Sequence, residues 1–171
     1  MIDVLIALGG NIGHVEVTFS RACLMLSSDL FDIQMSKLYQ TAPVYDKPRA
    51  VQPECAAPTY TNAVFQAKTW WDPHGLMQRL LEVEAALGRV RPAPECSPRT
   101  IDLDLLLYGD QIIVPTATSD LQVPHPRMHQ RQFVLEPACD IAPDWIHPEL
   151  GLPLKALLDA LLSEGAIRAT K

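Results

Sequence analysis

The chain has 171 residues, of which 48% are hydrophobic and 20% are charged, and its formal net charge is −6. This length and apolar content predict one compact globular domain over residues 1–171. The acidic balance argues against broad electrostatic binding of nucleic acid, whose phosphates favour clustered lysine and arginine. The apolar run at the N-terminus is too short for a signal peptide or a membrane span.

The four cysteines are spaced too widely for a structural zinc site or an obvious disulfide framework. They are Cys23, Cys55, Cys96 and Cys139. A reducing cytoplasm is therefore the expected compartment. We expect a cytoplasmic monomer whose partners are small molecules, with no nucleic acid and no membrane among them.

The first half of the chain predicts a strand, a helix and two further strands. Apolar residues alternate over residues 3–8 and the intervening residues are also apolar, which is typical of a central strand. A Gly-Gly-Asn turn follows, and apolar residues then recur at helical spacing within residues 15–26. Strands are expected over residues 33–40 and 60–68. The proline-rich stretch 43–58 between them is long for a hairpin loop.

The second half of the chain begins with a helix. Asp72 followed by Pro73 is a typical helix start, and Gly88 ends the apolar stripe that follows. The remaining predicted elements are a strand over 100–108, a segment over 112–114 that pairs back on it, and helices over 127–137 and 154–162. The element order predicts an α+β fold, a ferredoxin-like sandwich in which an antiparallel sheet carries helices on one face. The other face is then left for chemistry.

Two acidic side chains share one face of the strand predicted over residues 100–108. Successive side chains of a strand alternate, so Asp102 and Asp104 lie opposite an aliphatic face. That face consists of Ile101, Leu103, Leu105 and Leu107. Two carboxylates this close can bind one or two hard cations, of which Mg²⁺ is the natural choice. A solvated surface pair is the alternative interpretation.

Arginines cluster near this acidic pair. Arg89 and Arg91 follow the second predicted helix, and Arg99 comes just before Asp102. Arginines beside a metal suit a triphosphate, because both neutralise charge that shifts during phosphoryl transfer. The chain has no P-loop motif, so it is not a P-loop protein. Arg89 and Arg91 could equally be charges at the C-terminal end of a helix, and both interpretations stay open.

A second polar group and two aromatic residues complete the candidate residues. His125 and Arg131 lie in one short run whose prolines make its start rigid. Tyr60 and Phe133 are most simply core aromatics. Two such rings could also hold a flat heterocycle between them.

Five spaced segments of the chain share the motifs of one known family. They are Gly9-Gly10-Asn11, Tyr60-x-Asn62, Gly88-Arg89-Val90-Arg91, Pro98-Arg99-Thr100-Ile101-Asp102-Leu103-Asp104 and Val123-Pro124-His125. With these motifs the chain resembles the 6-hydroxymethyl-7,8-dihydropterin pyrophosphokinase family of folate biosynthesis, over nearly its whole length. The resemblance implies the ferredoxin-like fold and a Mg²⁺-dependent transfer of pyrophosphate from ATP to the pterin hydroxymethyl group, with release of AMP. It implies two Mg²⁺ ions, with ATP as co-substrate.

The resemblance also implies a role for individual residues. As catalytic residues it implies Arg91, Arg99, Asp102 and Asp104, and the two aspartates are also the metal ligands. As pterin-binding residues it implies Thr41, Pro43, Val44, Tyr60, Asn62 and Phe133. As ATP-binding residues it implies Glu84, Arg89, Arg91, Arg99, His125 and Arg131.

The chain departs from the family pattern in three places. Glu95, Cys96 and Ser97 stand where the family usually has Arg-Trp-Gly. Pro126 replaces a common aromatic residue, and the loop over residues 45–59 is longer than in many relatives. These departures motivate an alternative, a divergent relative that binds pterin or nucleotide with weak or no transfer. An RNA-binding domain of the same fold is disfavoured by the acidic charge and by the lack of an aromatic and basic run on the central strands.

Overall fold

The computed structural model describes residues 1–42, 59–91 and 98–169. Five strands form one antiparallel sheet: β1 (Ile2–Gly10), β2 (Leu30–Met35), β3 (Tyr39–Thr41), β4 (Tyr60–Thr69) and β5 (Asp102–Tyr108). The described residues also form four α-helices, which are α1 (Val15–Leu26), α2 (Pro73–Ala86), α3 (Gln132–Ile141) and α4 (Leu154–Ala169). A short 3₁₀ turn over Met128–Gln130 precedes α3, so the helix predicted over residues 127–137 begins later than expected.

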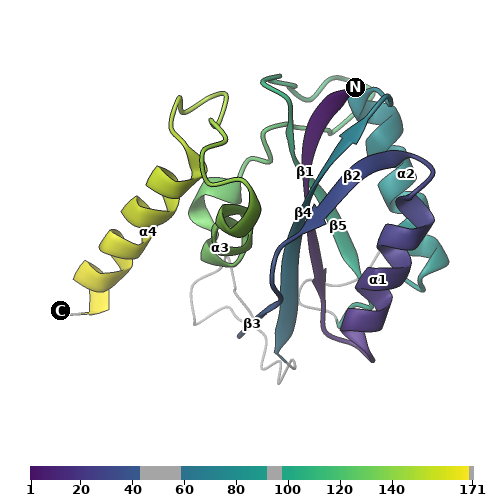
Figure 1. The fold of residues 1–171 in the computed structure, drawn as a ribbon, viewed down its shortest axis with the longest axis horizontal. Coiled ribbons are helices and arrows are strands. Elements are labelled where there is room, and N and C mark those ends of the chain that lie inside the picture. Colours follow the sequence, from purple (N-terminus) through teal and green to yellow (C-terminus); the bar gives the residue numbers. More distant parts are fainter. Residues whose placement is uncertain (43–58, 92–97, 170–171) are drawn as a thin grey trace.

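The sheet has the strand order β2-β4-β1-β5, and β3 also pairs with β4 (Figure 1). The strand predicted over residues 33–40 is divided into β2 and β3. Ser36 lies at this break, where its N–H donates to the Val64 carbonyl and its hydroxyl accepts from the Val64 N–H. As predicted, the Asp72 side chain caps α2, by accepting from the N–H groups of His74 and Gly75. The expected α+β fold with an antiparallel sheet is confirmed.

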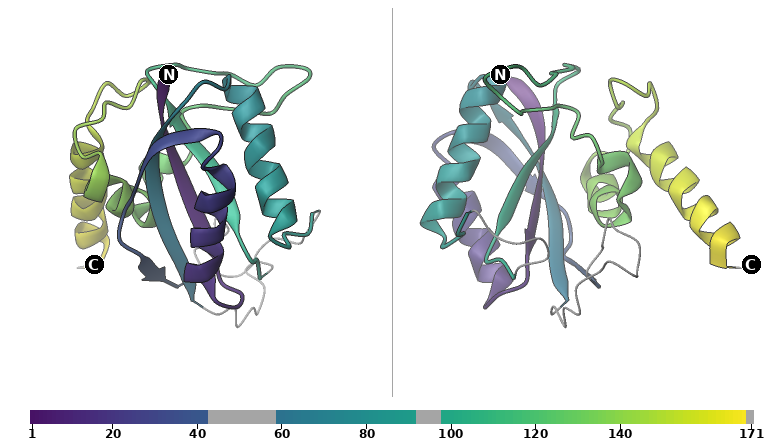
Figure 2. Two further views of the ribbon diagram at one scale, coloured as in Figure 1. Left: turned by 45° about the vertical axis from the view of Figure 1, so that its right-hand side comes forward. Right: turned by 180° about the vertical axis from the view of Figure 1, so that it is seen from behind.

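Helices cover both faces of the sheet. Helices α1 and α2 pack on one face, while α3 and α4 lie on the opposite side (Figures 1 and 2). The second face carries the apolar side chains of Leu5, Val64 and Leu106, and its helices keep them fully buried from water. The prediction that helices cover one face and leave the other free is wrong, because α3 packs against β4 and β3 on the second face and α4 packs against α3. None of the helices in the described ranges is long and apolar enough to cross a lipid bilayer.

A β-bulge in β5 changes the predicted aliphatic face. Leu105 and Leu107 pair with consecutive residues of β1, so Leu106 is an extra residue in the strand. Leu103 and Leu105 pack with α1 and α2, but Leu106 and Leu107 both pack with α3 and α4. The prediction that Leu107 belongs to the first face is wrong, because the bulge puts Leu106 and Leu107 on the same face and so breaks the alternation after Leu106.

The segment predicted to pair back on β5 has another partner. Ile113 forms an isolated bridge with Val123, through N–O distances of 2.6 and 3.0 Å. The outer edge of β5 is instead contacted at Leu106, whose carbonyl accepts from the His125 N–H at 2.9 Å. The prediction that residues 112–114 pair with this strand is therefore wrong.

We expect acid to destabilise the fold through His147. Its side chain is buried, and the centre of its ring lies 6.0 Å from that of His129. Within the described part of the chain its Nε2 has no hydrogen-bond partner. Burial is the largest cause that lowers the pKa of His147, and His129 lowers it further, whereas Glu149 raises it. The unfolded chain therefore binds a proton more readily, so this stability is complete above about pH 6.5 and is lost as the pH falls towards the folded pKa.

Urea unfolding at pH 7.5 and pH 5.5 measures this effect. His147→Gln should show a smaller loss of stability over that interval than the unsubstituted protein. His14→Gln, at an exposed position, is the control and should lose as much stability over this interval as the unsubstituted protein. An equal loss in all three proteins would contradict the assignment.

Candidate functional site

The candidate polar residues meet at one end of the sheet. Gly9 of β1 pairs with Asn62 of β4 on one side and with Asp102 of β5 on the other. A Cβ atom at Gly9 would lie 3.5 Å from Asn62 Oδ1 and 3.9 Å from Asp102 Cβ, so the two side chains flank the glycine. Asn62 and Asp104 lie two residues before Val64 and Leu106, which pack with α3 and α4, so their side chains are on the same sheet face. The site therefore lies on the sheet face that α3 and α4 cover in part, at the end of β1.

The turn after β1 is tied to the segment that precedes β5. The Asn11 N–H donates to the Arg99 carbonyl at 2.9 Å, and the Arg99 N–H donates to Asn11 Oδ1 at 2.7 Å. Gly10 lies against the same segment, where an added Cβ atom would be 2.7 Å from the Thr100 carbonyl oxygen. The absence of a side chain at Gly10 thus lets β1 approach Thr100 closely.

Gly10→Ala should destabilise the protein by about 1–3 kcal/mol, because the backbone at Thr100 must move to accommodate the methyl group. Gly9→Ala is the matched control, since its added methyl group meets the neighbours at ordinary contact distances. Urea unfolding of both variants measures the difference. Equal stability of the two variants would contradict the close approach.

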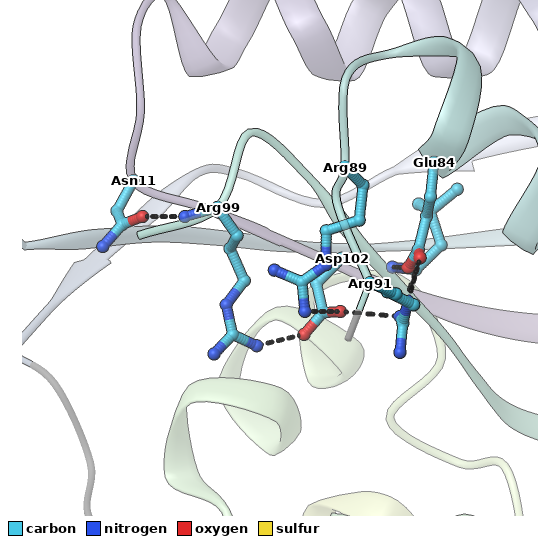
Figure 3. Close-up of polar contacts among 7 residues, drawn as sticks. Asn11, Glu84, Arg89, Arg91, Arg99 and Asp102 are labelled. Carbon is cyan, nitrogen blue, oxygen red and sulfur yellow. Dashed lines mark hydrogen bonds and ion pairs between the residues drawn. The ribbon is translucent and has the colours of Figure 1, made fainter. Parts of the chain in front are cut away.

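Three arginines converge on Asp102 (Figure 3). Arg99 lies 2.6 Å from Asp102 Oδ2, and Arg91 and Arg89 lie 3.3 and 3.4 Å from Oδ1. Arg89 and Arg99 come from segments that flank α2 and β5, while the Asp102 side chain is only 21% exposed. The arginine cluster formed by Arg89, Arg91 and Arg99 thus neutralises one half-buried carboxylate.

Glu84 connects this arginine cluster to the backbone of β5. Its Oε1 accepts from the Leu103 N–H at 2.6 Å, and its Oε2 accepts from Arg91 at 2.7 and 3.1 Å. Burial is the main cause that raises the pKa of Glu84, whereas the bonds from Leu103 and Arg91 act in the opposite direction. The buried carboxylate fixes the peptide between Asp102 and Asp104.

A second charged group surrounds Asp104. Burial, followed by the neighbouring Asp102, raises the pKa of Asp104, while His125 and Arg131 oppose this rise. Burial likewise lowers the pKa of His125, against the opposite influence of Asp104. The His125 Nδ1 atom accepts from the Arg127 N–H at 3.2 Å, so this ring is held by its own turn. The structure thus brings Asp104, His125 and Arg131 into electrostatic contact.

The candidate pterin-binding residues lie on β3, β4 and α3. Thr41 accepts a hydrogen bond from Asn62 Nδ2 at 2.8 Å, and Thr41 pairs with Tyr60 in the sheet. The guanidinium carbon of Arg99 is 5.6 Å from the centre of the Tyr60 ring. The guanidinium carbon of Arg131 is likewise 5.6 Å from the centre of the ring of Phe133, at the start of α3. The predicted Pro43 and Val44, and the variant loop at Glu95 and Cys96, lie outside the described residues.

The donor set fits a phosphate and its metal ion. Among the described residues, buried donors without an acceptor include Asn11 Nδ2, Arg89 Nε and Arg99 Nε. Such donors favour an anion. The same part of the chain contains no group of three or more acidic, histidine or cysteine side chains that could hold a metal. Mg²⁺ is usually bound through one or two carboxylates together with substrate phosphates, so Asp102 and Asp104 suffice.

Two features of the site were missed from the sequence. The sequence indicates Asn11 only as part of a turn and of a family motif, with no side-chain contact, and it gives no partner for the Leu103 N–H. A signal for the second existed, because Glu84 falls on the same helical stripe as the buried Leu76 and Leu80. An acid on a buried stripe requires a partner from the element beneath it.

The chain is similar to known proteins along most of its length. Residues 5–143 match the model of the family described as 7,8-dihydro-6-hydroxymethylpterin-pyrophosphokinase (HPPK). The chain is 38% identical over 149 residues to a 2-amino-4-hydroxy-6-hydroxymethyldihydropteridine pyrophosphokinase of Haemophilus influenzae, and the match covers 86% of each chain. A protein of the same name from Synechocystis is 32% identical, with 91% of this chain and 74% of that protein covered.

Longer proteins also contain this fold. The folic acid synthesis protein fol1 of Pneumocystis carinii is 33% identical over 160 residues, which are 93% of this chain but only 20% of that protein. A crystal structure of Plasmodium falciparum HPPK-DHPS with pterin and p-hydroxybenzoate matches 99% of this chain and 45% of its own, with a TM-score of 0.75 and 16% identity. The chain therefore spans about a fifth of the fungal relative and less than half of that solved chain, and the structural match supports the fold.

Proposed function

The chain belongs to the 7,8-dihydro-6-hydroxymethylpterin-pyrophosphokinase family, and we propose that it transfers pyrophosphate from ATP to 6-hydroxymethyl-7,8-dihydropterin. The two bacterial pyrophosphokinases described above support this activity, since the chain covers most of their length. The observation that carries the proposal is the convergence of three arginines on Asp102, at the sheet end where Glu84 fixes the strand. In the reaction the hydroxyl oxygen of the pterin attacks the β-phosphorus of ATP. The bond from that phosphorus to the oxygen shared with the α-phosphate breaks, AMP leaves and the hydroxyl proton is released.

Asp102 and Asp104 would hold the magnesium ions, which would neutralise phosphate charge and acidify the attacking hydroxyl. The arginine cluster pairs with Asp102 in the free protein and would contact phosphate oxygens when the nucleotide is bound. Arginines preorganised in this way stabilise charge that develops during transfer, without a large rearrangement. Glu84 would support them by holding Arg91 in place.

The pterin would bind between β4 and α3, beside the amide of Asn62. Asn62 Nδ2 donates to Thr41, so its Oδ1 remains directed to the site across Gly9, as an acceptor for a ring N–H. Tyr60 and Phe133 would pack on the flat ring. His125 and Arg131 would contact the phosphates on the far side of Asp104, which both of them influence electrostatically.

Release of AMP from ATP tests the reaction type and the acceptor together. The assay is run with Mg²⁺, with and without 6-hydroxymethyl-7,8-dihydropterin, and again after the metal is removed with EDTA. We expect AMP only when pterin and Mg²⁺ are both present. Measurable pterin binding without AMP would favour the divergent binding relative, and AMP that forms without pterin would contradict the proposed acceptor.

We further propose that the protein acts as a cytoplasmic monomer on small molecules. The described cysteines Cys23 and Cys139 are free thiols, which supports a reducing compartment, and the net charge of −6 supports the exclusion of nucleic acid. Light scattering during size-exclusion chromatography measures the oligomeric state.

A further inference from the structure

A polar contact joins β3 to α3 next to the proposed pterin pocket. The Tyr39 hydroxyl donates to Asp140 Oδ2 at 3.0 Å, and the Lys37 backbone N–H donates to the same oxygen at 3.1 Å. Tyr39 pairs with Asn62 in the sheet and lies two residues before Thr41 on the same strand. One partner of the contact therefore lies on β3, the strand whose Thr41 accepts a hydrogen bond from the Asn62 side chain.

The other partner lies on the helix that carries Phe133. Asp140 and Phe133 are seven residues apart, so they lie on nearly the same side of α3, two turns from each other. That helix packs against β4 and β3. The side of α3 that presents Phe133 is consequently the side that Asp140 ties to β3.

We propose that the contact of Tyr39 with Asp140 is a positioning latch, which sets the distance between the strand wall and the helix wall of the pterin pocket. The strand wall carries Asn62 and the helix wall carries Phe133. The inference rests on the proposed function, because it assigns these walls to the pterin. Tyr39 and Asp140 act through their neighbours and are positioning residues.

The environment of the latch suits a fixed hydrogen bond. Burial, followed by the hydrogen bond to Asp140 and the charges of Asp140 and Glu136, together raise the pKa of Tyr39 to about 12. The hydroxyl therefore stays protonated, and remains a donor, throughout the neutral pH range. Asp140 accepts hydrogen bonds from the Lys37 N–H and the Tyr39 hydroxyl, and these two bonds restrict the movement of that segment relative to α3.

Binding measurements on four variants test the latch. Tyr39→Phe and Asp140→Ala remove the contact, and Asp140→Asn retains an acceptor of the same shape. Lys37→Ala is the matched control, because it removes an 83% exposed ammonium group 3.9 Å from Asp140 but keeps the backbone N–H donor. Calorimetry gives the dissociation constants for pterin and for a non-hydrolysable ATP analogue with Mg²⁺, and thermal unfolding checks that each variant folds.

Loss of one hydrogen bond in Tyr39→Phe should weaken pterin binding by about three- to tenfold, and loss of both in Asp140→Ala should weaken it at least as much, with nucleotide binding unchanged in each. Asp140→Asn and Lys37→Ala should bind pterin like the unsubstituted protein. Pterin binding that is unchanged in Tyr39→Phe, or an equal loss for both ligands, would overturn the latch alone. Failure of the unsubstituted protein to bind pterin would overturn the proposed function, and this role with it.

Discussion

Asp102→Ala and Asp104→Ala should each slow AMP formation by about 10²- to 10³-fold, because each removes a charge that preorganises the phosphates and their metal. The fold should survive either change. Asp102 is partly exposed, and both aspartates lie on the face opposite Leu103 and Leu105. Steady-state assays across a range of Mg²⁺ concentrations measure the effect, and circular dichroism checks the fold.

Two further substitutions sharpen this test. Asp102→Asn keeps the shape of the side chain but removes its charge, so it should resemble Asp102→Ala in rate. Asp3→Asn changes a carboxylate on β1 at the opposite end of the sheet, where it pairs in register with Lys68, and should leave the rate unchanged. Turnover by Asp102→Ala or Asp104→Ala that no longer needs Mg²⁺ would disprove the metal assignment.

Glu84→Leu should lower the free energy of unfolding by about 1–3 kcal/mol, because the buried Leu103 N–H loses its acceptor. Leucine fills most of the volume, so the lost hydrogen bond dominates over a cavity. Arg91 also loses Glu84, but it keeps its contact with Asp102, and its half-exposed side chain can be solvated. The rate of AMP formation should fall too, since the peptide between Asp102 and Asp104 is no longer held.

Glu84→Gln distinguishes the two roles of this side chain. Its amide oxygen can still accept from the Leu103 N–H, so it should recover most of the stability, while Arg91 loses the charge of Glu84 and keeps Asp102 as a charged partner. Glu82→Gln, on an exposed part of the same helix, should affect neither stability nor rate. Urea unfolding and the AMP assay together measure these effects. A Glu84→Leu variant as stable as Glu82→Gln would contradict the structural role.

The fold was predictable where one sequence pattern had one structural solution. Alternation placed Asp102 and Asp104 opposite Leu103 and Leu105, and the structure confirms this. It failed at Leu107, because a bulge inserts a residue without any mark in the polar and apolar pattern. Likewise, the apolar character of Leu5 had indicated a central strand, but it gave no sign of which helices would cover its second face.

The site was less predictable, because its decisive contacts link segments far apart in sequence. The resemblance placed Glu84 near the nucleotide, yet its bond to Leu103 depends on how α2 lies over β5. The bond between Asn11 and Arg99 spans 88 residues, and that between Tyr39 and Asp140 spans 101. Neither follows from local spacing, since a pairing of this kind is set by the packing of whole elements.

The bulge at Leu106 also bears on how the molecule unfolds. The bulge adds Leu107 to the second apolar cluster beside Leu106, while Leu103 and Leu105 belong to the first, so β5 is anchored in both clusters, as are β1 and β4. Because the two clusters share these strands, neither cluster can unfold while the other stays folded. We therefore propose that the two helical layers lose structure together, in a single cooperative transition in which calorimetric and van't Hoff enthalpies agree.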